Sequence, residues 1–146
     1  MRSTILTGLA ILLTLVACKS RKPVAYDSSE AADLPREIAV QKLRELLPTA
    51  DYVYSTMPKD SLKPAEIKEY AVSDADVTVV RVKGEPIRLA FADVTEVVLA
   101  RTGSYHMGRV FSRFQTAKNT AHLEFQWKAV ESAQRCVDLF TALKSR

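Results

Sequence analysis

The sequence is poor in the residues that most catalytic and metal sites require. Its 146 residues include two histidines, two cysteines and four glycines. A protein zinc site takes three or four ligands at useful spacing, and His106 and His122, without a cysteine pair, do not supply one. No serine lies in a Gly-x-Ser-x-Gly turn, and no glycine-rich phosphate loop follows a strand-like segment. We therefore expect no enzyme active site, no metal and no cofactor.

The chain also lacks a large excess of charge. Its formal net charge is +4, and removal of residues 1–17 would take away Arg2 and leave +3. Nucleic-acid-binding domains carry a strong, clustered basic excess. The sequence therefore predicts no nucleic-acid partner.

A hydrophobic run long enough to cross a membrane is absent as well. The apolar segment from Ile5 to Ala17 falls short of the roughly 20 apolar residues that a transmembrane helix needs. Arg2 precedes this segment, and small residues stand at its end. A positive start, a short apolar segment and small residues at its end are typical of a secretory signal peptide. We interpret residues 1–17 as such a signal.

The residues Leu15-Val16-Ala17-Cys18, at the end of the apolar segment, resemble the lipobox of bacterial lipoproteins. The resemblance implies cleavage before Cys18, a diacylglycerol thioether on its sulfur and acylation of the new amine. Two or three acyl chains anchor a domain lastingly, whereas one chain binds a membrane reversibly. By resemblance to enterobacterial lipoproteins, Lys19 implies delivery to the outer membrane, facing the periplasm. An ordinary signal peptide with a chance cysteine is the alternative.

The remaining chain divides into a spacer and one domain. Residues 18–32 mix serine, lysine, acidic residues and Pro23 without an apolar period, and we interpret them as the lipidated cysteine followed by a flexible spacer. Residues 33–146 then form a single α+β domain. With Cys18 lipidated, Cys136 would have no disulfide partner in the chain.

Two helices are predicted, one at each end of this domain. The first runs from Pro35 to Leu47, with Asp33 as its cap and Pro48 as its stop. The second runs from Ala129 to Lys144. Each has one apolar stripe at helical spacing. The stripe residues are Ala39, Leu43, Leu46 and Leu47 in the first helix, and Ala129, Ala133, Cys136, Val137, Phe140 and Leu143 in the second.

Between the helices the apolar period changes to two, which predicts about seven short strands. Turn residues separate them, among them Met57 to Asp60, and two gaps are short enough for hairpins, so we expect a mostly antiparallel, curved sheet. The strands are Asp51–Thr56, Glu66–Val72, Asp76–Lys83, Ile87–Phe91, Val94–Arg101, Arg109–Gln115 and Ala121–Trp127. In the last one, His122, Glu124 and Gln126 alternate onto the polar face. The C-terminal helix is expected to cover the apolar face.

This order of elements resembles the pleckstrin-homology-like fold. The resemblance lies in the strand that runs directly into an amphipathic helix (FQWKAVESAQRCVDLFTAL) and in the stretch from Leu89 to Val97. The basic pattern of the phosphoinositide-binding members is missing here, because Lys59, Lys63 and Lys68 stand without the matching arginine. A cystatin-like sheet with one covering helix is the alternative fold.

Two groups of residues are candidates for function. Tyr105, His106 and Met107, between two glycines, are expected in an exposed loop that contacts a ligand or partner. A thiol–imidazole pair of Cys136 with His106 or His122 is disfavoured, because Cys136 falls on the apolar stripe of the last helix.

From these observations we expect a membrane-anchored envelope lipoprotein with a non-catalytic binding or adaptor domain. Its expected partners are the membrane, through lipid on Cys18, and an envelope protein. The alternative function is that of a carrier that binds a small apolar or anionic ligand in the curved sheet. An enzymatic function has the least support from the sequence.

Overall fold

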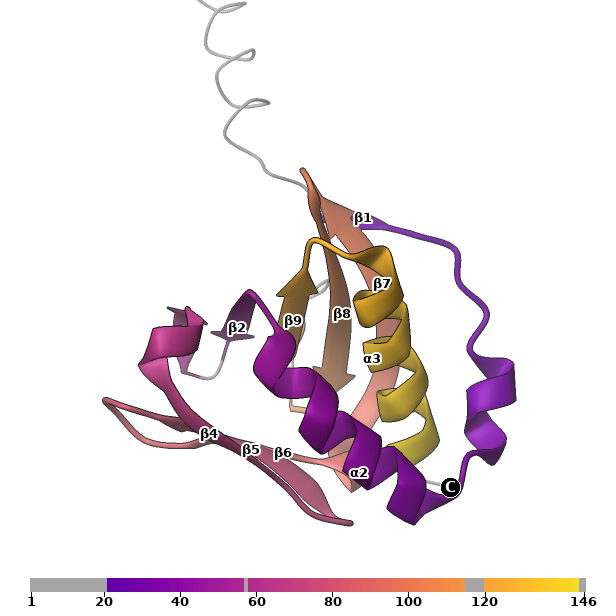
Figure 1. Cartoon of the computed structure of the whole chain (residues 1–146), viewed down its shortest axis with the longest axis horizontal. Helices are drawn as coiled ribbons and strands as arrows, with labels where there is room; N and C mark the ends of the chain where they lie inside the picture. The colour runs from indigo at the N-terminus through magenta and orange to yellow at the C-terminus, as the bar shows by residue number, and fades with distance from the viewer. Residues whose placement is uncertain (1–20, 57, 115–119, 145–146) are drawn as a thin grey trace, which may run out of the picture.

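The computed structural model of the chain describes residues 21–56, 58–114 and 120–144. Over these residues the fold is α+β, as predicted: two antiparallel sheets and two longer helices, with the C-terminal helix packed on a sheet (Figure 1). The strand order is β1-β7-β8-β9-β2-β3 in the larger sheet and β4-β5-β6 in the smaller one. The two sheets do not close into a barrel.

The predicted helices and strands appear in the predicted order along the chain, and β1 and β3 are additional strands that the sequence did not predict. The six-stranded sheet contains β1 (Lys22–Pro23), β2 (Tyr52–Thr56), β3 (Lys59–Leu62), β7 (Val94–Thr102), β8 (Tyr105–Ser112) and β9 (Leu123–Trp127). The three-stranded sheet contains β4 (Ile67–Val72), β5 (Asp76–Arg81) and β6 (Ile87–Ala90). The helices are α2 (Arg36–Leu46), α3 (Val130–Leu143) and the short 3-10 helices η1 (Ser29–Asp33), η2 (Leu47–Thr49), η3 (Pro64–Glu66) and η4 (Phe91–Asp93). No helix among the described residues has the length and apolarity that crossing a membrane requires.

Both helices bury most of their predicted apolar stripes, but the N-terminal cap of α2 is not the predicted residue. Leu43 and Phe140 are fully buried on α2 and α3, whereas Ala129 is exposed and precedes α3. Asp33 does not cap α2, because it ends η1, and Pro35 takes the cap position without a side-chain hydrogen bond. The fixed φ of proline suits this place, where no helical partner for its missing N–H exists.

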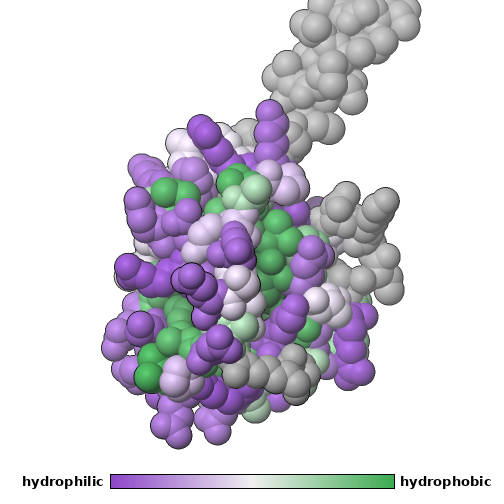
Figure 2. All heavy atoms as spheres, turned by 90° about the vertical axis from the view of Figure 1, so that its right-hand side faces the viewer, coloured by the Kyte–Doolittle hydropathy of each residue, from purple (hydrophilic) through white to green (hydrophobic). Residues whose placement is uncertain are grey.

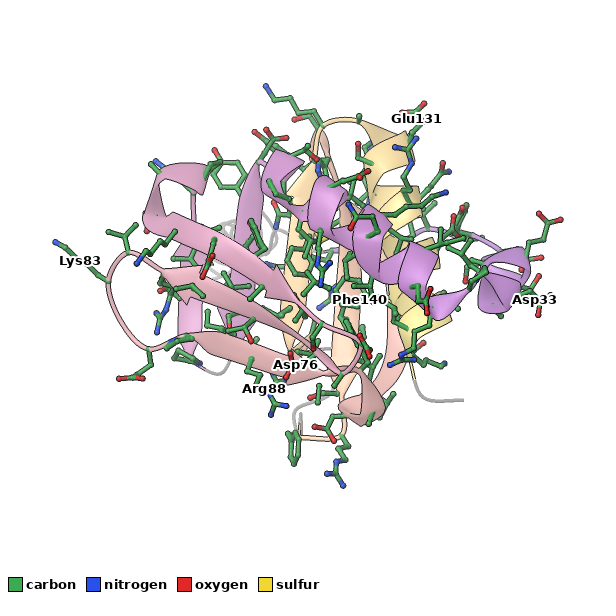
Figure 3. The ribbon with its side chains drawn as sticks, turned by 60° about the horizontal axis from the view of Figure 1, so that its bottom comes forward. Asp33, Asp76, Lys83, Arg88, Glu131 and Phe140 are labelled. Carbon is green, nitrogen blue, oxygen red and sulfur yellow. The ribbon has the colours of Figure 1, made fainter. Side chains whose placement is uncertain are left out.

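The core lies between α3 and the inner face of the six-stranded sheet, with α2 beside α3 and over the smaller sheet (Figure 1). Three fully buried phenylalanines join these layers. The ring of Phe140 stacks on Phe125 of β9 at a centroid distance of 5.6 Å and meets Phe91 of η4 edge-on at 6.1 Å. Figure 3 shows Phe140 at the centre of the molecule.

Strands β3 and β8 differ from the predictions. The turn predicted at Met57 to Asp60 ends before Lys59, because Lys59 and Asp60 belong to β3. Lys59 pairs with Thr56 of β2, and Asp60 pairs with Ser55. Strand β8 starts at Tyr105 instead of Arg109, so the β7–β8 connection is only Gly103 and Ser104. Gly103 has a φ of +56°, a conformation that glycine adopts without a steric penalty.

The predicted flexible spacer is largely a packed part of the domain. Strand β1 pairs with β7, and the amide of Val24 donates to the carbonyl oxygen of Leu99 at 2.8 Å. The chain then runs along the outside of α3, where η1 packs against it (Figure 1). The Tyr26 hydroxyl donates to the carboxylate of Asp138 at 2.8 Å. We call residues 21–33 the strap.

The strap places polar residues over the helical side of the molecule. Seen from that side, hydrophilic residues cover most of the surface and apolar residues show between them (Figure 2). Of the range predicted as spacer, residues 18–20 lie outside the described residues, and the prediction of a flexible spacer is wrong for the rest.

Candidate binding site on the outer face of the sheet

The face of the six-stranded sheet that points away from α3 carries a polar cluster. Partners in antiparallel register share a face, and Arg109 of β8 and Tyr54 of β2 are both partners of Glu124 in β9. Leu123 and Phe125, on either side of Glu124, are buried in the core. We call the opposite side the outer face. Its residues include Tyr52, Tyr54, Tyr105, Arg109, Glu124 and Gln126.

A buried ion-pair network organises this face. The side chain of Glu124 is 1% exposed, and its two carboxylate oxygens accept hydrogen bonds from the Nε atoms of Arg109 and Arg21, each at 2.8 Å. A buried carboxylate is costly unless cations and hydrogen bonds compensate it. The two guanidinium groups do so and leave one positive charge in excess. The side chain of Arg21 is 33% exposed, against 9% for Arg109, so Arg21 is the cation that a ligand can reach.

Aromatic rings hold both arginines in place. The guanidinium carbon of Arg21 lies 5.1 Å from the ring centroid of Tyr54, and that of Arg109 lies 5.1 Å from the ring of Phe111. Both distances are in the range of cation–π attraction. The network is therefore fixed from two sides, by charge and by aromatic packing.

An open depression lies beside this network. Its volume is about 650 Å³. Tyr52 and Tyr105 line it, and their rings pack edge-to-face with a centroid distance of 5.4 Å. Burial and the neighbouring Tyr52 raise the pKa of Tyr105, so its hydroxyl stays protonated at neutral pH. The site thus offers a cation, hydroxyl and amide groups and two ring faces to an anionic or polar group. The lining residues are Arg21, Tyr52, Ser61, Thr102, Gly103, Ser104, Tyr105 and Gln126.

The three residues predicted as a contact loop are strand residues, and the structure separates them. Tyr105 and Met107 share the outer face, where Met107 is fully buried. His106 lies on the opposite face as the partner of Trp127. The prediction of an exposed loop is therefore wrong. The glycines that suggested it have separate roles: Gly103 forms the tight turn, and Gly108 lies inside β8 against α3. Of the three residues, Tyr105 alone lines the depression.

Cys136 and His122 do not form a pair. Cys136 is fully buried on α3, and burial raises the pKa of its thiol, which keeps it protonated. His122 is 6% exposed, although alternation predicts it on a polar face, and its Nδ1 lies 2.8 Å from the Ser112 hydroxyl. Burial lowers the pKa of His122, against the opposing effects of the Arg88 backbone and the charge of Asp93.

We expect His122 to make stability pH-dependent. Because its pKa is lower in the folded state than its ordinary value of 6.5, the unfolded chain binds the proton more strongly. Its contribution is therefore complete above about pH 7 and is lost as the pH falls through 6.5 towards the folded-state pKa. Urea unfolding at pH 7 and pH 5 should show a smaller pH effect in His122→Gln than in the parent. An unchanged pH effect in His122→Gln contradicts the prediction.

A second depression lies between the strap and the helices. It has a volume of about 490 Å³, and Tyr26, Asp138 and Arg135 are among its lining residues. Burial raises the pKa of Asp138, and the hydrogen bond from Tyr26 partly offsets this effect. Burial and the same carboxylate raise the pKa of Tyr26 to about 12. The hydrogen bond that joins strap and helix thus keeps its proton on the tyrosine.

Sequence reasoning missed the main members of the site. Arg21 falls in the predicted spacer, while Arg109 and Glu124 belong to strands whose polar faces were expected in solvent. The opposite charges of Arg109 and Glu124 could have indicated an ion pair between neighbouring strands. The strand register that brings the two residues together is not visible in the sequence. Within residues 21–56, 58–114 and 120–144, no group of three or more acidic, histidine or cysteine side chains is placed to hold a metal ion.

Cys18, the predicted lipidation site, lies outside the described residues. Comparison of the chain with protein-family models, curated proteins and solved structures found no match.

Proposed function

We propose that this chain is a bacterial envelope lipoprotein, anchored through lipid on Cys18 in the outer membrane and facing the periplasm. Its domain binds another envelope component, without catalysis, through the outer face of the six-stranded sheet. The lipobox residues from Leu15 to Cys18 support the anchor. The observation that carries the binding role is the open depression beside the Arg21–Glu124–Arg109 network.

The chemistry of the depression favours a protein partner. Tyrosine and arginine dominate the binding energy of many protein interfaces, because they combine a large apolar area with hydrogen bonds. Tyr52 and Tyr105 are half-buried and already packed on one another, so little side-chain entropy is lost when a partner contacts them. Arg21, held by Glu124 and Tyr54, presents its remaining donors to a carboxylate or carbonyl of the partner.

A small anionic ligand is the second candidate. The volume of about 650 Å³ is in the range of small-molecule sites, although those sites are usually more enclosed. Native mass spectrometry of the detergent-solubilised protein distinguishes the two functions. A small constant mass increment that disappears in Arg21→Ala supports a carrier, whereas a co-purified protein chain supports an adaptor.

Replacement of the lipidated cysteine tests the anchor. We expect Cys18→Ser to abolish the acyl mass on the mature N-terminus and to leave the signal peptide uncleaved by lipoprotein processing. Mass spectrometry of the purified protein and metabolic labelling with palmitate measure both effects. Cys136→Ser is the matched control and should keep the acyl mass. Acylation that persists in Cys18→Ser contradicts the proposed anchor.

A photo-crosslinking amino acid tests the binding role in living cells. Placed at Ser61, an exposed residue that lines the depression, it should give a discrete crosslinked product. The same probe at Ser29, exposed on the strap, is the control and should not give that product. Arg21→Ala and Tyr105→Ala should weaken the Ser61 product. Equal crosslinking from both positions, or none from Ser61, overturns the assignment of the outer face.

A further inference from the structure

Two like charges face each other at the edge of the six-stranded sheet. Lys22 of β1 and Arg101 of β7 are register partners, and both residues are exposed. Arg101 donates from Nε to the carbonyl oxygen of Gly103 at 3.1 Å. Among the described residues, no carboxylate forms an ion pair with either side chain. Like charges directly opposite one another destabilise a strand pair, so an anion bound between them would stabilise this edge.

A further cation and an aromatic ring lie at the same end of the sheet but on its other face, because Arg101 pairs with His106 and Tyr105 is the neighbouring residue in β8. Arg21 precedes Lys22 and lies on the outer face, where its network with Glu124 has one positive charge in excess. Tyr105, at the start of β8, lies directly across the turn from β7. We call Arg21, Lys22, Arg101 and Tyr105 the hairpin end. The carboxylate of Asp51 is a negative charge near this end, since besides burial it helps to raise the pKa of Tyr105, and it accepts a hydrogen bond from the Lys128 amide at 3.2 Å.

The hairpin end is also the place where the chain from Cys18 enters the fold. Two residues, Lys19 and Ser20, lie between Cys18 and Arg21, and a fully extended chain spans at most about 3.6 Å per residue step, so these three steps reach at most about 11 Å. This distance is close to the Debye length of about 8–10 Å within which a charged membrane surface acts. Figure 1 shows β1 and the β7–β8 turn together at this end of the sheet.

We propose that the hairpin end docks on the phosphate groups of an anionic lipid bilayer, with Lys22 and Arg101 sharing a phosphate. This inference rests on the proposed lipidation of Cys18. Tyr105 suits the same place, because tyrosine has an apolar ring and a polar hydroxyl and is enriched at membrane–water interfaces. The β5–β6 hairpin, which carries Lys83 at its tip (Figure 3), belongs to the smaller sheet, which lies at the other end of the molecule from β1 and the β7–β8 turn (Figure 1).

Fluorescent probes on the mature, lipidated protein test this orientation. A thiol-reactive dye is attached to Ser104→Cys at the hairpin end or to Lys83→Cys as the control. Cys136 is buried, and the proposed lipidation would block the thiol of Cys18. The protein is placed in vesicles of phosphatidylethanolamine and phosphatidylglycerol that contain a lipid-borne quencher. We expect strong quenching at Ser104→Cys and little at Lys83→Cys. In phosphatidylcholine vesicles the protein should stay anchored and lose this difference.

Charge removal measures the contribution of the pair. Each cation near an anionic surface is expected to change the ratio of docked to free domain roughly fivefold. Lys22→Ala with Arg101→Ala should therefore lower this ratio about 25-fold. Lys59→Ala with Lys63→Ala removes the same charge at the other edge of the sheet and should leave the ratio unchanged.

Equal quenching at the two probe positions, or equal effects of the two double charge variants, contradicts the docking proposal but not the proposed lipid anchor. A mature protein without acyl mass that washes off phosphatidylcholine vesicles overturns the anchor itself. The two failures are therefore distinguishable.

Discussion

Replacement of Phe140 by alanine is expected to lower the free energy of unfolding by about 3–5 kcal/mol. Phe140 is fully buried on α3 and contacts the rings of Phe125 and Phe91. Its loss removes the apolar contact between the helix and both ring partners and leaves a cavity that a packed core fills only in part. Because a domain of this size is stable by about 5–15 kcal/mol, the variant should be at the margin of folding at 37 °C.

Urea unfolding followed by circular dichroism measures this effect. Phe114→Ala is the matched control, since Phe114 is 50% exposed and stacks on Arg113 at the surface. Its effect should stay within about 0.5 kcal/mol. A loss of similar size in both variants would show that Phe140 is not a centre of the core.

Replacement of Gly108 by alanine should also destabilise the fold, by about 1–3 kcal/mol or more. The reason is steric and not conformational. A Cβ atom at Gly108 would lie 2.7 Å from Sγ and 3.2 Å from Cβ of Cys136, far inside van der Waals contact. The absence of a side chain in β8 thus lets α3 approach the sheet, and alanine would push the helix away.

The double variant Gly108→Ala, Cys136→Ala separates this clash from other effects. Removal of Sγ relieves the closest contact, so part of the stability lost in Gly108→Ala should return in the double variant. Cys136→Ala alone should destabilise by a smaller amount, because it removes buried sulfur without adding a clash. If the two single effects simply add, the contact between β8 and α3 is not the cause.

The periodic parts of the fold could be predicted from the sequence. The stripe from Ala133 to Leu143 and the alternation of Leu123, Phe125 and Trp127 reflect burial on one side, and both predictions are confirmed. Strand β3 could not be predicted in this way, because Lys59, Asp60 and Ser61 are polar and follow Pro58. Its pairing with β2 is set by register and not by an apolar pattern.

The candidate site was predicted only in part, because it depends on contacts between distant segments. Glu124 follows an alternation that normally means exposure, yet Arg21, 103 residues earlier in the chain, helps to bury it. Gly108 was misinterpreted as a loop residue, although its role is the close approach of α3. Tyr105 was predicted as a contact residue because exposed aromatic residues in loops often bind a partner, although it lies in β8 and not in a loop.

The packed strap has a practical consequence for the preparation of the protein. A recombinant fragment that begins at Asp33, where composition alone suggests the domain boundary, would lack both Arg21 and Tyr26. Glu124 would keep a single cationic neighbour, Asp138 would lose its tyrosine donor, and the edge of β7 would be open for aggregation. Expression for crystallisation or ligand screening should therefore start no later than Arg21.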